Sequence, residues 1–134
     1  MTVVDASVWV SRLVPQDVHH VQSRSWLEQY TADGNLLVAP VILLPEVAGA
    51  VARRTGLSEL GQQAIQAILR IPGLRLVTLD SRLGLEAARL AADLRLRGAD
   101  AVYVAVAHRL RLPLITWDEE QRLRAATAIV VRTP

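Results

Sequence analysis

Residues 2–7 read Thr-Val-Val-Asp-Ala-Ser, an apolar run of strand length that ends in an acidic residue just where a helix is expected to begin. Val3 and Val4 suit a buried strand. A helix is expected from about Ala6, so Asp5 lies at the junction of the two elements. An acid in this place has two interpretations: it caps the helix, or it binds a ligand at the edge of a sheet.

The same alternation of strand and helix continues along the chain. Further strands are expected at Leu36–Ala39, Leu74–Leu79, Leu114–Thr116 and Ala128–Val131. Further helices are expected from after Asp17 to about Asp33, and at Val41–Arg54, Ser58–Ile71, Arg82–Arg97 and Ala99–Leu110. Strands separated by helices predict a largely parallel sheet with helices on both faces. We expect residues 1–134 to form a single α/β domain.

The expected helix Arg82–Arg97 has the most regular pattern. Charge pairs at i,i+4 spacing are expected on its exposed face at Arg82–Glu86, Arg89–Asp93 and Asp93–Arg97. Gly98 is expected to end this helix. Asp80 precedes it and is interpreted as its N-cap rather than as part of a site.

Acidic residues interrupt four apolar stretches, at Asp5, Glu46, Asp100 and Asp118. Glu46, for example, is the only charged residue between Asn35 and Arg53. Burying an unpaired carboxylate costs several kcal/mol, so each acid needs a compensating partner. Each has an ordinary alternative role as a helix cap or in a helix dipole. One site shared by all four acids explains them together.

Parallel-sheet topology offers such a site. Asp5 and Asp118 follow strands, at the sheet edge where open α/β folds bind ligands. Glu46 and Asp100 lie in early turns of helices and are expected to lean over the same edge. Carboxylates about 5 Å apart repel by about 3 kcal/mol per pair, so a cation is needed. Oxygen ligands without nitrogen or sulfur favour Mg²⁺ or Mn²⁺, and such ions can hold a phosphodiester and activate water.

Two hydroxyl groups accompany the acids. Ser7 lies two residues after Asp5, and Thr116 lies two residues before Asp118. In a strand Thr116 and Asp118 point to the same side. Each hydroxyl is expected to donate a hydrogen bond to a carboxylate or a bound water and hold it in place.

The composition excludes several kinds of site. The fifteen cationic residues are all arginine, and the absence of lysine excludes a P-loop and a Schiff base. The absence of cysteine excludes disulfides and thiolate zinc sites. Nine acidic residues remain outside the group of four, so the rest of the surface should attract a polyanion. With no membrane-length apolar run and no secretory signal, a cytoplasmic location is expected.

Short motifs surround the four acids in chain order: Val4-Asp5-Ala6-Ser7, Pro45-Glu46-Val47, Ala99-Asp100-Ala101 and Thr116-Trp117-Asp118. In this combination the sequence resembles the PIN-domain ribonucleases, most of all the small VapC-type toxins of toxin–antitoxin pairs. The resemblance implies a PIN-like three-layer α/β/α sandwich with a central, mostly parallel sheet of about five strands. It also implies endonucleolytic cleavage of RNA with Mg²⁺ or Mn²⁺, a homodimer, and an antitoxin bound across the acidic groove.

The resemblance further implies roles for individual residues. Asp5, Asp100 and Asp118 would be the main metal ligands, and Glu46 would act directly or through a water. Ser7 and Thr116 would steady the acids. Gly98 departs from the family, in which a serine often precedes the third acid. Arg12, Arg53 and Arg54 are candidate RNA contacts because they lie near two of the acids in the sequence.

Other functions remain open at this point. Within the nuclease interpretation, the alternative is a stand-alone enzyme of RNA processing or quality control. A non-catalytic PIN-like subunit that binds a partner in the groove is a second alternative. A phosphorelay receiver domain has a similar acidic α/β sheet, but the missing lysine and the single N-terminal acid argue against it.

Overall fold

The computed structural model describes all residues, 1–134, as a five-stranded sheet between two layers of helices. The strands are β1 (Thr2–Val4), β2 (Leu37–Pro40), β3 (Leu74–Val77), β4 (Leu114–Ile115) and β5 (Val131–Arg132). The helices are α1 (Ala6–Leu13), α2 (His20–Ala32), α3 (Leu43–Thr55), α4 (Ser58–Leu69), α5 (Ser81–Leu94), α6 (Gly98–Leu110) and α7 (Glu119–Ala125).

The sheet has the order β3-β2-β1-β4-β5, and every neighbouring pair is parallel. The first strand therefore lies at the centre. Val3 pairs with Val38 of β2 on one side and with Leu114 of β4 on the other. The predicted parallel α/β architecture is confirmed, and the central position of β1 places Asp5 in the middle of the sheet's carboxyl edge.

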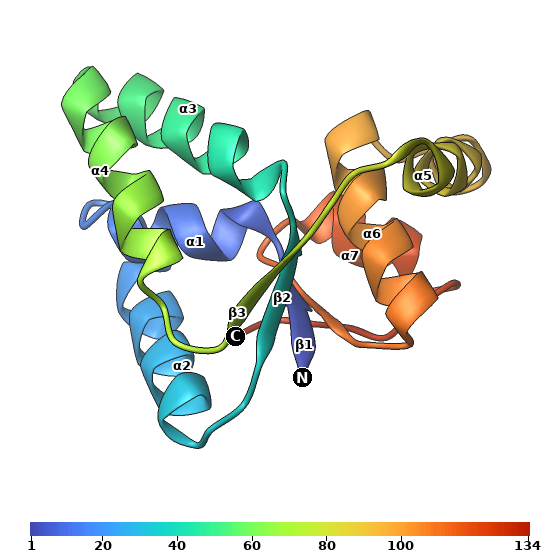
Figure 1. Cartoon of the computed structure of the whole chain (residues 1–134), viewed down its shortest axis with the longest axis horizontal. Coiled ribbons are helices and arrows are strands. Elements are labelled where there is room, and N and C mark those ends of the chain that lie inside the picture. The colour runs from blue at the N-terminus through green and yellow to red at the C-terminus, as the bar shows by residue number, and fades with distance from the viewer.

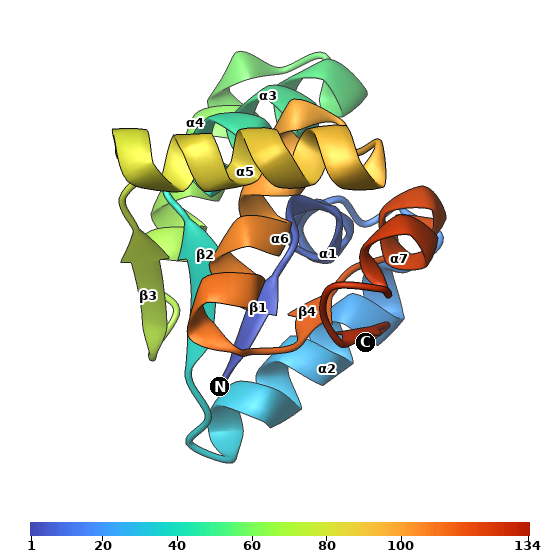
Figure 2. The ribbon, with the colours of Figure 1, turned by 90° about the vertical axis from the view of Figure 1, so that its right-hand side faces the viewer.

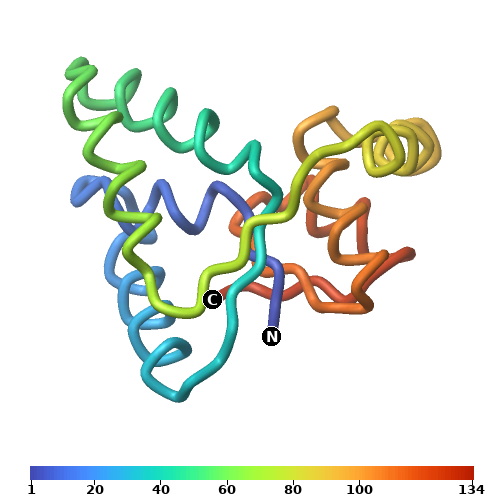
Figure 3. The backbone as a smooth tube through the Cα atoms, viewed as in Figure 1, coloured from blue at the N-terminus to red at the C-terminus, as the bar shows by residue number.

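The two helical layers come from different halves of the chain (Figures 1 and 2). Helices α1 to α4 lie on one face of the sheet, and α5, α6 and α7 lie on the other. The backbone passes from the first layer to the second through β3, as the change from green to yellow in Figure 3 shows. The site at the sheet edge is thus bordered by one layer on each side.

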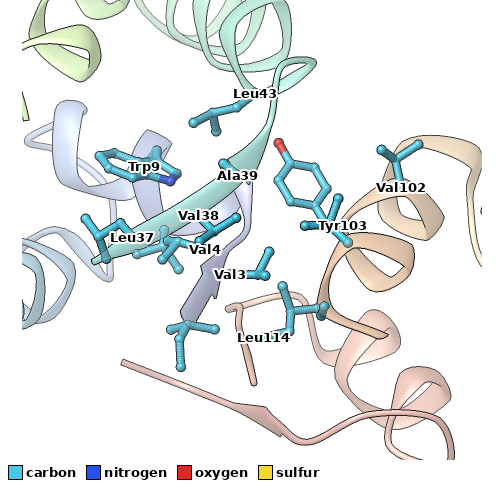
Figure 4. Packing of buried hydrophobic residues seen from close by; sticks show 14 of the residues in the cluster. Val3, Val4, Trp9, Leu37, Val38, Ala39, Leu43, Val102, Tyr103 and Leu114 are labelled. Carbon is cyan, nitrogen blue, oxygen red and sulfur yellow. The ribbon is translucent and has the colours of Figure 1, made fainter. Parts of the chain in front are cut away.

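The hydrophobic core fills the space between the sheet and both layers (Figure 4). Trp9 of α1 packs on one face, and Tyr103 of α6 lies on the other with its hydroxyl directed toward the side of Leu43. Residues Ala101 to Ala107 of α6 are all buried. A helix that is apolar nearly all round has to be covered on both sides, and this packing fixes the helix that bears Asp100.

The end of α5 differs from the prediction. The helix stops at Leu94, where Arg95 takes a left-handed conformation with φ 55°, and Gly98 begins α6 instead of ending α5. Of the three expected charge pairs, Arg82–Glu86 forms at 4.0 Å and the other two do not. Arg97 lies beyond the helix, so it loses the helical spacing from Asp93 and is free to pair elsewhere.

Two other elements also differ from expectation. Helix α7 directly follows Asp118, where no helix was expected, and β5 begins at Val131, three residues later than predicted. Both elements are short, and short elements depend on tertiary packing more than on local sequence pattern. None of the helices is long and apolar enough to cross a lipid bilayer.

Candidate active site

All four predicted acids line one pocket of about 550 Å³ at the carboxyl edge of the sheet. Asp5 follows β1, and Asp118 follows the adjacent strand β4 after two residues. Glu46 lies in the first turn of α3, and Asp100 lies in the first turn of α6. The fold therefore brings together acids from one helix in each layer and from the two central strands.

Asp5 is the most buried of the four acids, with 5% of its surface exposed. The Ser7 backbone N–H donates to its Oδ2 at 3.0 Å, and the Thr116 hydroxyl donates to the same oxygen at 3.1 Å. Gln121 Nε2 lies 3.5 Å from the other oxygen, Oδ1, a long contact. Oδ2 of Asp5 is thus fixed by two hydrogen bonds, whereas Oδ1 accepts no short one.

A chain of hydroxyl groups connects Asp5 to the backbone of the β4–α7 junction. The Trp117 N–H donates to Ser7 Oγ at 3.0 Å, and the Asp118 N–H donates to Thr116 Oγ1 at 3.0 Å. Ser7 Oγ and Thr116 Oγ1 lie 3.2 Å apart. Since a hydroxyl has one proton and that of Thr116 goes to Asp5, Ser7 is the donor to Thr116. Both predicted hydroxyls therefore contact the acid cluster, Thr116 directly and Ser7 through Thr116 and its own backbone.

Asp100 and Asp118 share a guanidinium group. Arg97 Nε lies 3.3 Å from Asp100 Oδ2, and Arg97 Nη2 lies 3.0 Å from Asp118 Oδ2. The other oxygen of Asp118 accepts from the Gln121 N–H at 2.8 Å, which caps α7. Asp118 is therefore a helix cap and a pocket wall at the same time, so the two interpretations of this acid do not exclude each other.

Glu46 is half-buried, and its Oε1 has no hydrogen-bond partner. Burial raises the pKa of Glu46, and the nearby Tyr103 hydroxyl partly opposes this, although the two groups do not meet at good hydrogen-bonding geometry. Buried polar atoms without partners are rare in folded proteins, and those that persist mark sites of strain, ligand binding or catalysis. The free oxygen of Glu46 belongs to a residue that lines the pocket.

Burial raises the pKa of three of the four acids, and repulsion between carboxylates adds to this for two of them. Burial raises the pKa of Asp5, and its hydrogen bonds from Ser7, Thr116 and Gln121 only partly oppose this. Burial is also the largest cause of the raised pKa of Glu46 and of Asp100. The negative charge of Asp5 raises both pKa values further, while Arg97 lowers that of Asp100. The acids are close enough to interact electrostatically, which is the arrangement that a cation stabilises.

The family model of the PIN domain matches residues 2–126. The chain belongs to the PIN-domain family. Among solved structures, VapC20 of Mycobacterium tuberculosis, a toxin that cleaves the sarcin-ricin loop, superimposes with a TM-score of 0.78 at 18% identity, over 100% of both chains. VapBC2 of Rickettsia felis, bound to promoter DNA, gives 0.74 at 14% identity, over 98% of this chain and 97% of the other.

A toxin–antitoxin complex of Klebsiella pneumoniae gives a TM-score of 0.65 at 16% identity, over 91% of this chain and 90% of the other. At such identities the likeness shows a common fold only. No curated protein has a significant sequence match to this PIN domain.

The side chains that line the pocket are of the chemical type that a hard divalent cation prefers. The pocket offers carboxylate oxygens and neither cysteine nor a convergent histidine pair, and Glu46 Oε1 has no partner. As the side chains stand, however, no three Asp, Glu or His residues are grouped closely enough to hold a metal ion. The positive charge between Asp100 and Asp118 comes from Arg97 instead. The chemistry of the set fits Mg²⁺ or Mn²⁺, with a rearrangement of these side chains on binding.

The structure places two of the three candidate RNA contacts in the pocket and the third outside it. Arg53 and Arg54 of α3 line the pocket, and Arg54 forms an ion pair of 2.5 Å with Asp17. Arg12 lies outside the lining, with a buried Nε that has no partner, so the structure does not bring it to the acids. Sequence proximity to Asp5 was misleading here, because α1 carries Arg12 two turns away from the sheet edge.

Arg97 and Gln121 contact the acids but were not predicted as site residues. Arg97 lies three residues before Asp100, a spacing at which opposite charges meet on a helix, and this signal was present. Gln121 contacts both Asp5 and the carbonyl of Asp100, with its own Oε1 unpartnered. Gln121 lies three residues into the unpredicted helix α7, so nothing in the sequence pointed to it.

The wall of the pocket also contains a stacked pair. The rings of His19 and Trp117 lie 3.8 Å apart at an interplanar angle of 4°, and both residues line the pocket. The indole N–H of Trp117 donates to Ser23 Oγ at 2.7 Å and so fixes the ring from α2. Asp80, by contrast, accepts from the Leu83 N–H at 2.8 Å, which confirms its predicted role as the N-cap of α5.

Proposed function

We propose that this PIN domain is a Mg²⁺- or Mn²⁺-dependent endoribonuclease and the toxin of a toxin–antitoxin pair. The observation that carries the proposal is the convergence of Asp5, Glu46, Asp100 and Asp118 on one pocket of a PIN fold. Three of these acids have raised pKa values, chiefly because burial disfavours ionisation and, for Glu46 and Asp100, also because of neighbouring negative charge. Such strained carboxylates, assembled from distant parts of a chain, are typical of functional sites.

The four acids would hold the metal, Asp5, Asp100 and Asp118 directly and Glu46 directly or through a water. When bound, the ion neutralises the carboxylates, lowers the pKa of a water and stabilises charge on the phosphodiester. Asp5 Oδ1 and Glu46 Oε1 make no short hydrogen bond in the structure, so a cation bound to them would not have to break one. Hard oxygen donors of this kind match the preference of Mg²⁺ and Mn²⁺.

The remaining residues of the pocket position the acids and the substrate. Thr116 fixes Oδ2 of Asp5, and Ser7 in turn fixes Thr116, so that the carboxylate keeps one orientation. Arg53 and Arg54 of α3 also line the pocket, and their guanidinium groups can attract the phosphates of a strand that enters it. No side chain of the pocket is required as a nucleophile, because water takes that role in hydrolysis.

The toxin assignment rests on the solved structures that share this fold. Similar structures include a toxin that cleaves the sarcin-ricin loop and complexes of toxins with antitoxins. By analogy with them, an antitoxin protein is the expected partner of this chain, alongside its RNA substrate. Co-expression with the product of a neighbouring short reading frame should yield a stable complex with suppressed nuclease activity. The homodimer and the cytoplasmic location stay predictions.

The decisive experiment compares RNA cleavage by the parent and by Asp100→Asn, with Mg²⁺ and with EDTA. Asp93→Asn on the exposed face of α5 is the matched control, because it removes the same charge far from the pocket. We expect Asp100→Asn and EDTA each to reduce cleavage by at least about a hundredfold, and Asp93→Asn to leave it unchanged. Equal cleavage by Asp100→Asn and the parent would exclude the acids as the catalytic group.

The alternatives give different results in the same assays. A stand-alone processing nuclease would cut RNA in the same way but would have no antitoxin, and its expression would not arrest growth. A non-catalytic binding subunit would neither cut RNA nor bind Mn²⁺ in a calorimetric titration. The four intact acids favour catalysis over this second alternative.

A further inference from the structure

Arg97 is the one basic residue that touches the acid cluster directly. Its Nε reaches Asp100 at 3.3 Å and its Nη2 reaches Asp118 at 3.0 Å, while Arg53 and Arg54 line the pocket without an ion pair to the four acids. The guanidinium thus bridges two residues that the proposed function treats as metal ligands. It supplies the positive charge that these carboxylates need when no cation is bound.

The bridge cannot persist unchanged when a divalent cation binds. Asp118 Oδ1 already accepts the Gln121 N–H, so Arg97 holds the oxygen that would otherwise face the pocket. A cation on Asp100 and Asp118 would stand within a few ångströms of the guanidinium, and like charges at that distance repel strongly in a partly buried site. The cation and Arg97 therefore compete for the same two carboxylates.

Arg97 is also able to move. Its side chain is 71% exposed, it precedes α6 in an extended backbone conformation, and nothing but the two carboxylates holds it. Because water reaches the guanidinium and screens its charge, the ion pairs contribute only modest free energy, and a cation can displace the side chain. Once released, the guanidinium remains on the pocket wall across from Arg53 and Arg54, where its planar fork suits a phosphate.

We propose that Arg97 has two positions: it neutralises Asp100 and Asp118 in the metal-free protein, and it binds a phosphate of the substrate strand once a divalent cation has displaced it. This inference rests on the proposed function. The residue links the two events, because a strand that holds Arg97 away from the carboxylates favours cation binding, and the cation in turn favours the strand.

The first test is a calorimetric titration with Mn²⁺. Arg97→Gln removes the competitor, so we expect it to bind Mn²⁺ about threefold to tenfold more tightly than the parent. Arg53→Gln removes a charge from the same pocket without breaking a contact to the acids, and Arg89→Gln removes one from exposed α5. Both controls should change the affinity by less than about twofold, which separates direct competition from a general effect of charge.

The second test measures the strand contact through salt dependence. The probe is a short phosphorothioate oligodeoxythymidine, which resists hydrolysis, in saturating Mn²⁺. Loss of one phosphate contact should make the slope of log Kobs against log salt about 0.7 less negative in Arg97→Gln than in the parent. Arg89→Gln should keep the parent's slope.

The outcomes separate this inference from the proposed function. If the parent binds Mn²⁺ and Arg97→Gln binds it equally or more weakly, the competition is absent and this inference alone fails. Equal salt slopes for the parent and Arg97→Gln would overturn the proposed contact between Arg97 and a phosphate of the strand. If the parent neither binds Mn²⁺ nor cuts RNA, both the proposed function and the role of Arg97 fall.

Discussion

Thr116 donates a hydrogen bond of 3.1 Å to Asp5, although 111 positions separate them in the sequence. The contact exists because β1 and β4 are neighbours at the centre of the sheet, which places the ends of both strands side by side. Thr116 is fully buried, and it also accepts the N–H of Asp118. One hydroxyl therefore sets the positions of two acids, and Ser7 sets the position of that hydroxyl.

Replacing Thr116 with valine tests this network, because valine keeps the shape and removes the hydroxyl. The N–H of Asp118 and the hydroxyl of Ser7 lose their acceptor, so we expect unfolding in urea to show a loss of about 1–3 kcal/mol. RNA cleavage should fall about tenfold to a hundredfold as Asp5 loses its fixed orientation. Thr116→Ser restores the hydroxyl and should recover most of both losses; a valine variant as stable and active as the parent would show that the network is dispensable.

Asp5→Asn should make the protein more stable at pH 7 while abolishing cleavage. Burial raises the pKa of Asp5 in the folded chain above its unfolded value, so the folded state keeps the proton to higher pH. The parent therefore loses stability as pH rises from about 4, the ordinary value for aspartate, through the raised pKa. The asparagine carbonyl can still accept from Ser7 and Thr116, and the unpartnered Oε1 of Gln121 can accept its amide after a rotation.

The measurement is urea unfolding of the parent and Asp5→Asn across pH 4 to 7, with Asp93→Asn as the exposed control. The difference between the parent and Asp5→Asn isolates the contribution of this carboxyl from those of the other titrating groups. A difference that does not grow with pH in this window would mean that Asp5 is ionised in the folded protein throughout.

Mn²⁺ binding should strengthen with pH and release protons. The pKa values of Asp5, Glu46 and Asp100 are all raised, chiefly by burial, so some of their carboxyls retain protons above the ordinary acidic range. A cation binds the ionised form, which displaces those protons. Calorimetry in two buffers of different ionisation enthalpy, at about pH 5.5 and 7.5, should detect proton release that is larger at the lower pH. Binding that is independent of pH and buffer would contradict this.

Two glycines offer a matched pair for the packing of the first helical layer. A Cβ on Gly61 of α4 would lie 2.5 Å from the carbonyl oxygen of Ala48 in α3, so Gly61→Ala should separate these helices and cost about 1–3 kcal/mol. Gly84 of α5 has nothing within 4 Å of the added atom, so Gly84→Ala should stabilise the protein by about 0.5–1 kcal/mol. Thermal unfolding of both variants checks the contrast; similar shifts for the two would mean that α3 and α4 are not packed this closely.

The layered fold could be predicted because its signals are local and repeated. Apolar runs identified β1, β2 and β3 well, and Val104 in the middle of α6 is buried as the all-round apolar pattern indicated. The convergence of the acids followed from topology, since the carboxyl ends of parallel strands share one edge. Those inferences needed no knowledge of side-chain contacts.

The parts that were missed depend on tertiary context. Arg97 was assigned to a helical charge ladder, but Arg95 ends α5 in a left-handed conformation that charge spacing does not reveal. The seven-residue helix α7 is too short to be stable by itself, so its helicity and the position of Gln121 arise from packing. Arg12 was placed near the site by sequence distance, whereas the direction of α1 carries it away.

The central place of β1 has a consequence for synthesis of the chain. The partner strand on one side, β2, is the next strand to be made, but the strand on the other side, β4, follows only after β3 and helices α3 to α6. A nascent chain that stops before residue 114 contains the whole first helical layer but lacks β4, Thr116 and Asp118. If the pocket is the nuclease we propose, the growing polypeptide is harmless to the RNA around it until β4 and the residues that follow it have been added.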